Sequence, residues 1–241
     1  PVGALTSKPY AFSARSWELT RTETIDVMDA VGSNVRVDSR GSEVLRVLPI
    51  LNEEINEEWI SDKTRFACDG LKRQRLDTPF VRRNGVLEKA SWDDAFAAIA
   101  DALKDTVGDK IAAISGDLVD CEGLTALKDL MEALGSKNYD CRQDGADLEA
   151  ASRVSYLFNT TFAGIEKSDA CLLIGVNPRI EAAIVNARIR KRWLGGGFNI
   201  GVVGKKMELT YNYDHLGVSP LILNELADGK IPFCETLQNA E

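Results

Sequence analysis

Five cysteines, one histidine and several carboxylate pairs are the side chains with which this chain could do chemistry. No two cysteines have the C-x-x-C spacing of zinc and redox motifs, and their number is odd. We therefore expect free, buried or idle thiols in a reducing compartment and no disulfide framework. His215 is the only histidine and has no cysteine near it in sequence, so we expect a structural role. The cysteines are Cys68, Cys121, Cys141, Cys171 and Cys234.

These side chains form no catalytic constellation in the sequence. A Ser/His/Asp triad has no support in a chain with one histidine and no G-x-S-x-G motif. The carboxylate pairs Glu53–Glu54, Glu57–Glu58 and Asp93–Asp94 stand in polar contexts where helices begin, which is typical of solvated faces. We predict no catalytic residue.

The segment Gly175-Val176-Asn177-Pro178-Arg179 follows an apolar run and precedes a helical pattern. Ligands of open α/β sheets bind at the carboxyl ends of strands, so one interpretation is a nucleotide or phosphate site beside Arg179. The other is an ordinary strand-to-helix turn in which Pro178 begins the helix. The lack of a G-x-G-x-x-G motif and of a P-loop lysine favours the turn.

Four cations, Arg188, Arg190, Lys191 and Arg192, crowd the end of that helical pattern. Cations at this place complement the helix dipole, so we expect a solvated helix end. A patch that docks a partner is the alternative. Gly195-Gly196-Gly197 predicts that the helix stops there.

The elements that must position these residues are of two kinds. Apolar runs at 111–114, 170–174 and 200–203 predict strands. They alternate with helical patterns, which predicts a parallel sheet covered on both faces. The predicted helices span about 121–134, 146–158, 180–193 and 219–228.

The first third of the chain predicts β structure instead. Alternation predicts strands at 24–28, 34–38 and 43–49, and residues 56–68 have helical character. We expect Trp59, Ile60 and Phe66 to hold this small domain together.

Two strong local signals follow this β-rich part. Asn84-Gly85 between 80–83 and 86–89 predicts a type I′ hairpin. Ser91 and Asp94 form a capping-box pattern that begins a helix. Its expected buried face consists of Trp92, Ala95, Phe96, Ile99 and Leu103.

Composition excludes some classes of function. The 241 residues allow one or two domains, and the net charge of −8 disfavours a nucleic-acid partner. No apolar run reaches the roughly 18 residues of a transmembrane helix. Both ends of the chain, at Pro1 and Glu241, read as cut from something longer.

Six long segments carry a resemblance to a known family: Pro1–Phe12, Ile25–Asn34, Ile55–Leu76, Gly175–Ala182, Asn186–Lys191 and Tyr213–Gly217. They resemble the large iron–sulfur subunits of respiratory complex I (NADH:ubiquinone oxidoreductase), within the wider molybdopterin oxidoreductase family. The resemblance runs nearly end to end and looks closest to the mitochondrial and alphaproteobacterial branch.

This resemblance implies a subunit of a proton-translocating NADH:ubiquinone reductase, passing electrons from NADH and FMN through 2Fe-2S and 4Fe-4S clusters to ubiquinone. The clusters would be bound upstream of Pro1, and this fragment would bind none. Pro1, Val2, Gly3 and Leu5 would pack around an adjacent 4Fe-4S cluster without ligating it. The implied partners are other peripheral-arm subunits, including the flavin-bearing one. The implied place is the matrix side of the mitochondrial inner membrane, or the cytoplasmic face of a bacterial plasma membrane.

The wider family binds a cluster through C-x-x-C-x-x-x-C and a distant cysteine before a Lys-Gly-Arg-Phe-like segment. By resemblance these positions fall on Asp26, Asp29, Ser33 and Ser61, none of which is a thiolate. Iron–sulfur clusters are held by cysteine thiolates, so we predict that the ligands are lost and the site holds no metal. Cys68, seven residues after Ser61, is too far along the chain to substitute.

The sequence therefore predicts an α/β chain in three parts. Residues 1–20 would be the tail of a ferredoxin-like iron–sulfur region. Residues 21–77 would be a small β-rich cluster-type domain without its ligands, and 78–241 the first part of a parallel-sheet, molybdopterin-oxidoreductase-like α/β domain. We interpret the chain mainly as a scaffold. The alternatives are a molybdopterin-dependent oxidoreductase that binds its cofactor in the α/β part, and an interaction module that docks a partner through Arg188–Arg192.

Overall fold

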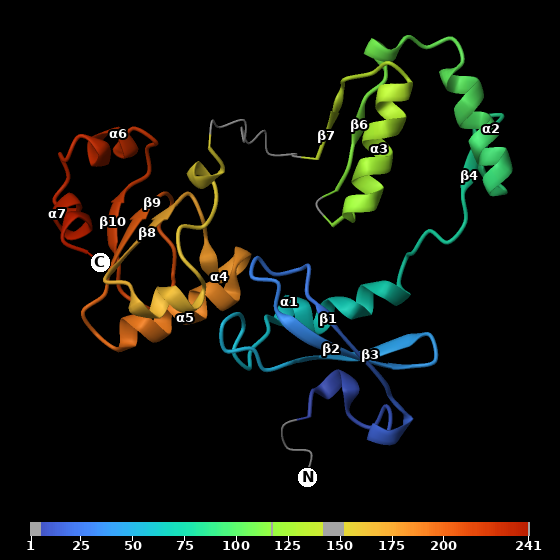
Figure 1. Ribbon diagram of the computed structural model, residues 1–241. Coiled ribbons are helices and arrows are strands. Elements are labelled where there is room, and N and C mark those ends of the chain that lie inside the picture. The colour runs from blue at the N-terminus through green and yellow to red at the C-terminus, as the bar shows by residue number, and fades with distance from the viewer. Residues whose placement is uncertain (1–5, 117, 142–151, 241) are drawn as a thin grey trace. The chain divides into compact units, whose positions relative to one another are not determined.

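The structure, a computed structural model, describes residues 6–116, 118–141 and 152–240 (Figure 1). The chain folds as two compact units. The first consists of Pro1–Lys72 with Phe158–Glu241, and the second consists of Arg73–Leu157.

The first unit begins with a three-stranded antiparallel sheet in the order β1-β2-β3. Its strands are β1 (Thr20–Ile25), β2 (Asn34–Arg40) and β3 (Glu43–Pro49). The expected strand 24–28 stops at Ile25, because Asp26 begins a turn in which its amide donates to the carbonyl oxygen of Ser33 (2.8 Å). Short 3-10 turns, Lys8–Tyr10 and Ser16–Glu18, precede the sheet.

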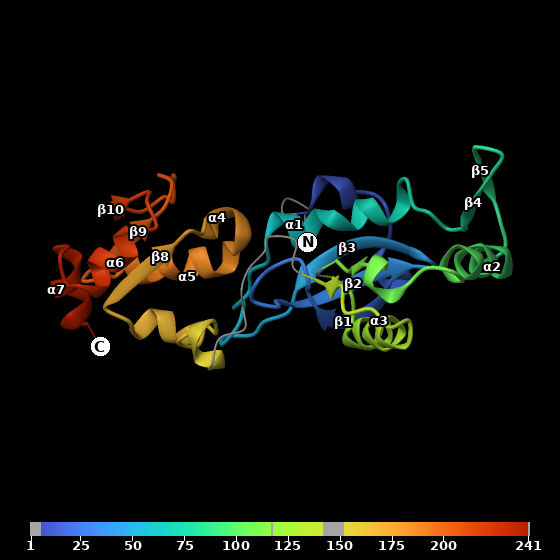
Figure 2. The ribbon, with the colours of Figure 1, turned by 90° about the horizontal axis from the view of Figure 1, so that it is seen from above.

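Helix α1 (Asp62–Phe66) lies beside β3, as Figures 1 and 2 show, and a 3-10 segment, Ala67–Lys72, continues it. The predicted helical stretch 56–68 is therefore wrong over its first residues. The helix begins late because Ser61 caps it, with its Oγ accepting the amide of Thr64 (3.1 Å).

The core of this small β domain differs from the prediction. Trp59 is 56% exposed and Phe66 is 42% exposed, so their expected packing role is wrong. Residues 56–61 are not helical, and their apolar side chains therefore share no buried face. The buried apolar side chains here are Tyr10, Val31, Val35 and Val47.

The second unit confirms the two strong local signals. Strands β4 (Phe80–Arg83) and β5 (Val86–Lys89) form the predicted hairpin, with positive φ at both Asn84 (49°) and Gly85 (84°). Helix α2 (Trp92–Leu103) begins where predicted, and the Ser91 Oγ accepts the amide of Asp94 (3.1 Å).

The predicted buried face of α2 is wrong for the described residues. Trp92, Phe96 and Ile99 are each more than half exposed, and Ala95 is the residue of this helix that is buried. Hydrophobic periodicity indicates which face of a helix is apolar, but a second layer must cover that face to bury it.

A parallel pair of short strands, β6 (Ala113–Ile114) and β7 (Tyr139–Asp140), completes the second unit with α3 (Cys121–Ala133) between them in sequence. Helix α3 is as predicted, and β6 covers the end of the predicted strand 111–114. Residues 146–151 of the predicted helix 146–158 lie outside the described residues, and the described residues 152–158 contain no α-helix. Its described end contains a 3-10 turn, Arg153–Ser155.

The chain then returns to the first unit and builds a three-stranded parallel sheet in the order β10-β9-β8. This confirms the predicted parallel arrangement for 170–174 and 200–203, whereas the predicted strand 111–114 contributes β6 to a separate sheet with β7. Strands β8 (Ala170–Ile174) and β9 (Asn199–Val203) match the predicted ones. Strand β10 was missed, because Asp214-His215-Leu216-Gly217 carries no continuous apolar run. The sheet's strands and helices are β8, β9, β10 (Asp214–Gly217), α4 (Pro178–Glu181), α5 (Ala183–Leu194), α6 (Ile222–Ala227) and α7 (Phe233–Gln238), with a 3-10 turn at Ala163–Lys167.

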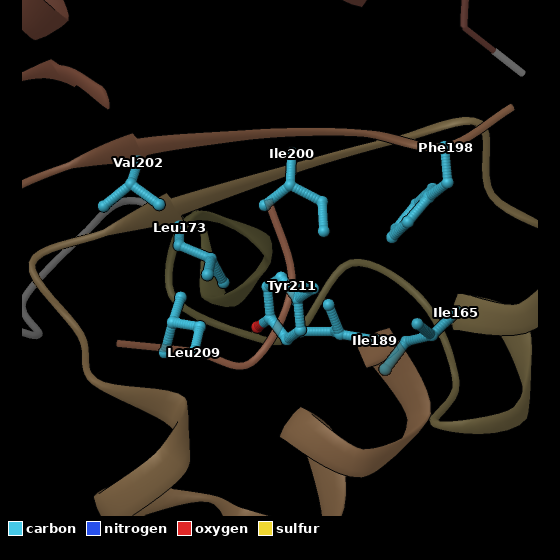
Figure 3. Packing of buried hydrophobic residues seen from close by; sticks show 8 residues of the cluster. All are labelled: Ile165, Leu173, Ile189, Phe198, Ile200, Val202, Leu209 and Tyr211. Atoms are coloured by element: carbon cyan, nitrogen blue, oxygen red, sulfur yellow. The ribbon is translucent and has the colours of Figure 1, made fainter. Parts of the chain in front are cut away.

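The core of this part lies between the sheet and α5. Figure 3 shows Leu173, Ile200 and Val202 pointing from the strands towards Leu209 and Tyr211. Each fully buried aliphatic side chain of this kind contributes about 1.5–3 kcal/mol relative to an exposed one. The remaining members of the cluster are Ile165, Ile189 and Phe198.

All five cysteines lie within the described residues as free thiols, and Cys121 and Cys141 are exposed, not buried. Cys171 packs against this core, and burial raises its pKa to about 11, so it stays a protonated, unreactive thiol at neutral pH. Among the described residues, no helix has the length and apolar character needed to cross a membrane.

Candidate functional site

The four predicted ligand positions lie in two neighbouring segments of the small β domain. Asp26, Asp29 and Ser33 belong to the loop between β1 and β2, and Ser61 precedes α1. All four are at most 9% exposed. The loop closes on itself, because Asp26 N donates to Ser33 O (2.8 Å) and Gly32 takes a positive φ of 65°.

Three of these side chains cap the local backbone. Asp26 Oδ1 accepts the amide of Met28 (2.9 Å), and Asp29 Oδ1 accepts the amide of Val31 (3.3 Å). Ser61 Oγ serves as the N-cap of α1. Aspartates and serines commonly stabilise turns and helix starts in this way.

Thr64 connects the two segments. Its Oγ1 donates to Asp26 Oδ2 (2.5 Å) and lies 2.9 Å from Ser61 Oγ, and its side chain is buried. Two of the four positions are thus joined through one hydroxyl group.

Burial and the neighbouring charge of Asp26 raise the pKa of Asp29, although the Val31 amide opposes them. Ser33 Oγ is buried without a hydrogen-bond partner in the part of the chain that the structure describes. No group of three His, Cys, Asp or Glu side chains within the described ranges is placed to hold a metal ion.

A second candidate place is a cavity of about 580 Å³ at the carboxyl ends of β8 and β9. Asn177 caps α4 by accepting the amide of Arg179 (3.2 Å), and Pro178 is the first helical residue. Glu181 Oε1 accepts the amide of Asn177 (3.0 Å), while Arg179 donates to Glu208 O (3.0 Å). The protein's own oxygens therefore take the groups that would bind an anion, which supports the strand-to-helix turn over a phosphate site.

Two aromatic side chains fix the wall of this cavity. Tyr213 Oη accepts the amide of Met207 (2.9 Å) and donates to the carbonyl of the same residue (2.7 Å). His215 Nε2 lies 2.7 Å from Gly204 O, a structural contact of the kind expected. The loop from Gly204 to Met207 is thus held at both ends.

The prediction of a solvated helix end is wrong for Arg188 and Arg192 at the basic end of α5, whereas Lys191 is 53% exposed. Arg188 is 2% exposed and donates to Glu166 Oε1 (2.6 Å). Lys191 pairs with Glu57 (2.5 Å) and Glu166 (3.0 Å). Arg192 bonds the carbonyl oxygen of Ser168 (2.8 Å). Arg190 is exposed, as the prediction has it.

Sequence reasoning missed Asn56, which is fully buried. Its Nδ2 donates to the carbonyl oxygens of Ile50, Glu57 and Trp59, and its Oδ1 accepts the amide of Asn34. This side chain shapes the loop between β3 and α1. An Asn between acidic residues gave no signal of burial, because its partners are backbone groups.

Comparison with known proteins matches two parts of the chain to family models. Residues 75–241 match the sequence model described as molybdopterin oxidoreductase. The chain belongs to the molybdopterin oxidoreductase family. Residues 19–69 match the model of an NADH-ubiquinone oxidoreductase NDSU1/NuoG-like 4Fe-4S domain.

Three similar relatives of this family member are 52% identical to it over its whole length. They are NADH dehydrogenase [ubiquinone] iron-sulfur protein 1, mitochondrial, of Solanum tuberosum, the NADH-ubiquinone oxidoreductase 78 kDa subunit, mitochondrial, of Neurospora crassa, and an NADH-quinone oxidoreductase subunit of Rickettsia felis. The chain spans 33%, 33% and 36% of their lengths, respectively.

The 4Fe-4S cluster named in that domain does not fit this molybdopterin oxidoreductase family member. A cluster needs thiolates, whereas Asp26, Asp29 and Ser61 are oxygen donors already bonded to the protein. Pro1, Val2, Gly3 and Leu5, expected to pack near another cluster, lie outside the described residues.

A phosphate-bearing pterin does not fit the strand-end cavity either. The cavity lining has three cations, Arg179, Lys205 and Lys206, against the two carboxylates of Glu181 and Glu208, so little net positive charge is offered to a phosphate. Arg179 is already bonded to the backbone oxygen of Glu208 and lies 3.7 Å from its carboxylate. No step of a reaction therefore passes through such a group here.

Proposed function

We propose that this chain is part of the large iron–sulfur subunit of an NADH:ubiquinone oxidoreductase and acts there mainly as a scaffold. The whole subunit would pass electrons from NADH and FMN through 2Fe-2S and 4Fe-4S clusters, bound upstream of Pro1, to ubiquinone. The identity of 52% to three such subunits supports the assignment to the complex. The observation that carries the scaffold role is the use of Asp26, Asp29 and Ser61 as backbone caps rather than as ligands.

We also propose a role for each of three parts of the chain. Residues 1–20 would end a ferredoxin-like region, 21–77 would form the metal-free cluster-type domain, and 78–241 would begin the molybdopterin-oxidoreductase-like domain. Pro1, Val2, Gly3 and Leu5 would pack around a neighbouring 4Fe-4S cluster, where burial and hydrogen bonds tune its potential. The partners would be other peripheral-arm subunits, including the flavin-bearing one. The complex would lie on the matrix side of the mitochondrial inner membrane or on the cytoplasmic face of a bacterial membrane.

Metal analysis of the anaerobically purified chain tests the scaffold role. We expect iron, molybdenum and tungsten all far below one atom per chain. Stoichiometric molybdenum or tungsten would favour the alternative, a molybdopterin-dependent oxidoreductase. Stoichiometric iron would contradict the loss of ligands at Asp26, Asp29, Ser33 and Ser61.

A second measurement tests membership of the complex. Arg188→Met in the complete subunit should lower the amount of assembled complex, because Arg188 joins two parts of the scaffold. Arg190→Met, on the exposed side of the same helix, should leave assembly unchanged. Substituting Asp for Val2 or Leu5 should shift the potential or occupancy of the neighbouring cluster, and an unaltered cluster would refute their proposed packing role.

A further inference from the structure

Thr64 is the side chain that stands between the predicted ligand positions. It lies in α1, is 6% exposed, and is 38 residues from Asp26 in sequence. Its Oγ1 is within hydrogen-bond distance of both Asp26 Oδ2 and Ser61 Oγ. Its amide also donates to Ser61 Oγ (3.1 Å). One residue thus contacts two of the four positions at once.

We propose that Thr64 replaces the absent metal as the cross-link of this domain, and that its side chain closes the cluster position to any metal. A metal cluster would tie the β1–β2 loop to the start of α1 through its ligands. Thr64 ties the same two segments through the Asp26–Thr64–Ser61 hydrogen bonds. A hydrogen bond to a buried carboxylate is among the stronger ones in proteins, which suits this role.

The cluster position is closed by the Thr64 side chain as well as by the lack of cysteine ligands. Lys63-Thr64-Arg65-Phe66 stands where the resembling motif reads Lys-Gly-Arg-Phe, so Thr64 occupies a glycine position. Glycine has no Cβ and would leave the volume between Asp26 and Ser61 open. Restoring cysteines alone is therefore insufficient to restore a cluster.

The first test measures the cross-link in the full 241-residue chain. Thr64→Val keeps the shape of the side chain and removes its hydroxyl. It should lower Tm by about 2–8 °C, the range expected for one strong hydrogen bond in a chain of this size. Thr125→Val is the matched control, because the exposed Thr125 donates its hydroxyl to the carbonyl of Cys121 within its own helix, α3. An equal, small effect of both substitutions would overturn the cross-link.

The second test measures whether Thr64 closes the site. One variant combines the four substitutions Asp26→Cys, Asp29→Cys, Ser33→Cys and Ser61→Cys. A second variant adds Thr64→Gly to these four. Both proteins are incubated anaerobically with ferric iron, sulfide and excess thiol, which reduces part of the iron, and are then treated with dithionite to bring any cluster to its reduced state. We expect about four irons per chain and the electron paramagnetic resonance of a reduced cluster only when Thr64→Gly is present.

Two further proteins serve as controls for the iron loading. The native chain, treated identically, measures iron bound adventitiously by its own five cysteines. The four cysteines combined with Thr125→Gly measure the effect of a glycine in a helix elsewhere. The closing role of Thr64 is overturned if the fourfold variant loads as well without Thr64→Gly. It is overturned equally if neither variant loads.

Replacing Ser33 tests whether the site around Asp26 and Ser61 is closed or binds a ligand. Its hydroxyl is buried without a partner in the described part of the chain. Ser33→Ala should therefore leave Tm unchanged or raise it, because an unpaired buried polar group is removed. A lower Tm would mean that the hydroxyl binds something, and would overturn a site closed by Thr64.

Discussion

The guanidinium of Arg188 donates two hydrogen bonds to the carbonyl oxygen of Ile55, from Nε at 3.2 Å and from Nη2 at 3.1 Å. The two residues are 133 positions apart in sequence. The same guanidinium also donates to Glu53 O (2.5 Å) and to the carboxylate of Glu166 (2.6 Å). One buried cation therefore joins α5 to the loop between β3 and α1, and so joins the two sequence segments of the first unit.

Arg188→Met should destabilise the first unit by about 2–4 kcal/mol, because it removes several hydrogen bonds of a buried guanidinium while the partly exposed Glu166 keeps Lys191 as a partner. Methionine fills much of the volume but leaves the carbonyl oxygens of Glu53 and Ile55 without their donor. Urea denaturation measures the loss in the free energy of unfolding. Limited proteolysis should in addition show faster cleavage in the loop between β3 and α1.

The control for that change lies two residues away. Arg190 is exposed on the same helix, so Arg190→Met should change stability by less than about 0.5 kcal/mol. Equal effects of the two substitutions would mean that lost helix charge, and not the buried contacts, explains the result.

Asp38 makes the stability of the small β domain dependent on pH. It is fully buried and accepts hydrogen bonds from Arg36 Nε (2.8 Å) and Arg46 Nε (2.7 Å). Burial alone would raise the pKa of Asp38, but the two guanidinium groups outweigh it and lower the pKa below its usual 3.8. Arg46 is also placed over the ring of Tyr10, 4.1 Å from its centroid.

Asp38→Asn should therefore cost about 1–3 kcal/mol at neutral pH. A carboxyl group whose pKa is lowered by folding stabilises the protein fully above its unfolded pKa. That contribution is lost as the pH falls through the lower, folded pKa. Denaturation of both proteins across pH 2 to 7 should show their difference shrinking below about pH 4.

The exposed Asp105 supplies the comparison for this titration. Asp105→Asn, a surface substitution away from any buried ion pair, should change the free energy of unfolding by less than about 0.5 kcal/mol at neutral pH. A difference for Asp38→Asn that stays constant down to pH 2 would refute the ionic explanation.

The local elements of this fold were predictable, and the long-range polar contacts were not. Asn84-Gly85 and the cap at Ser91 set their hairpin and helix through neighbouring backbone groups, so short sequence windows contain the information. Arg188 and Asn56 bind mostly backbone carbonyls elsewhere in the chain, which have no sequence signature. A cluster of basic residues therefore predicted a solvated surface where the protein has a buried contact.

In the candidate site, too, the sequence identified residues but did not predict their contact with one another. Resemblance to the family placed Asp26 and Ser61, and the structure joins them through Thr64. The Lys63-Thr64-Arg65-Phe66 segment contained the signal for that contact, because a β-branched polar residue stands at a glycine position. Which side chain Thr64 contacts depends on the loop that packs against α1, and only the folded domain shows this.

Gly201 in β9 is a position where a single methyl group should be costly. A Cβ there would lie 2.8 Å from two ring atoms of Phe233 and 3.1 Å from Leu216 Cδ1. Because Phe233 is buried, Gly201→Ala should destabilise the parallel sheet by about 1–3 kcal/mol through overpacking. Thermal denaturation followed by circular dichroism measures the change.

Gly70 is the matched comparison, because a Cβ there meets no atom within 4 Å and its φ is not positive. Gly70→Ala should stabilise the chain by up to about 1 kcal/mol, since alanine restricts the unfolded state. Opposite signs for the two substitutions are expected. A neutral Gly201→Ala would mean that α7 moves away from the sheet at little cost.

Tyr213 should control the loop that lines the strand-end cavity. Tyr213→Phe removes the hydroxyl that both accepts from Met207 N and donates to Met207 O, and leaves these two backbone groups without that partner. We expect a loss of about 1–3 kcal/mol and faster hydrogen exchange at the Met207 amide. Tyr156→Phe, at an exposed tyrosine, is the control and should change neither quantity. Because His215 and Arg179 still hold Gly204 and Glu208, the effect should stay confined to this loop. Faster exchange throughout β9 as well would contradict a local role and would make Tyr213 a determinant of the whole sheet.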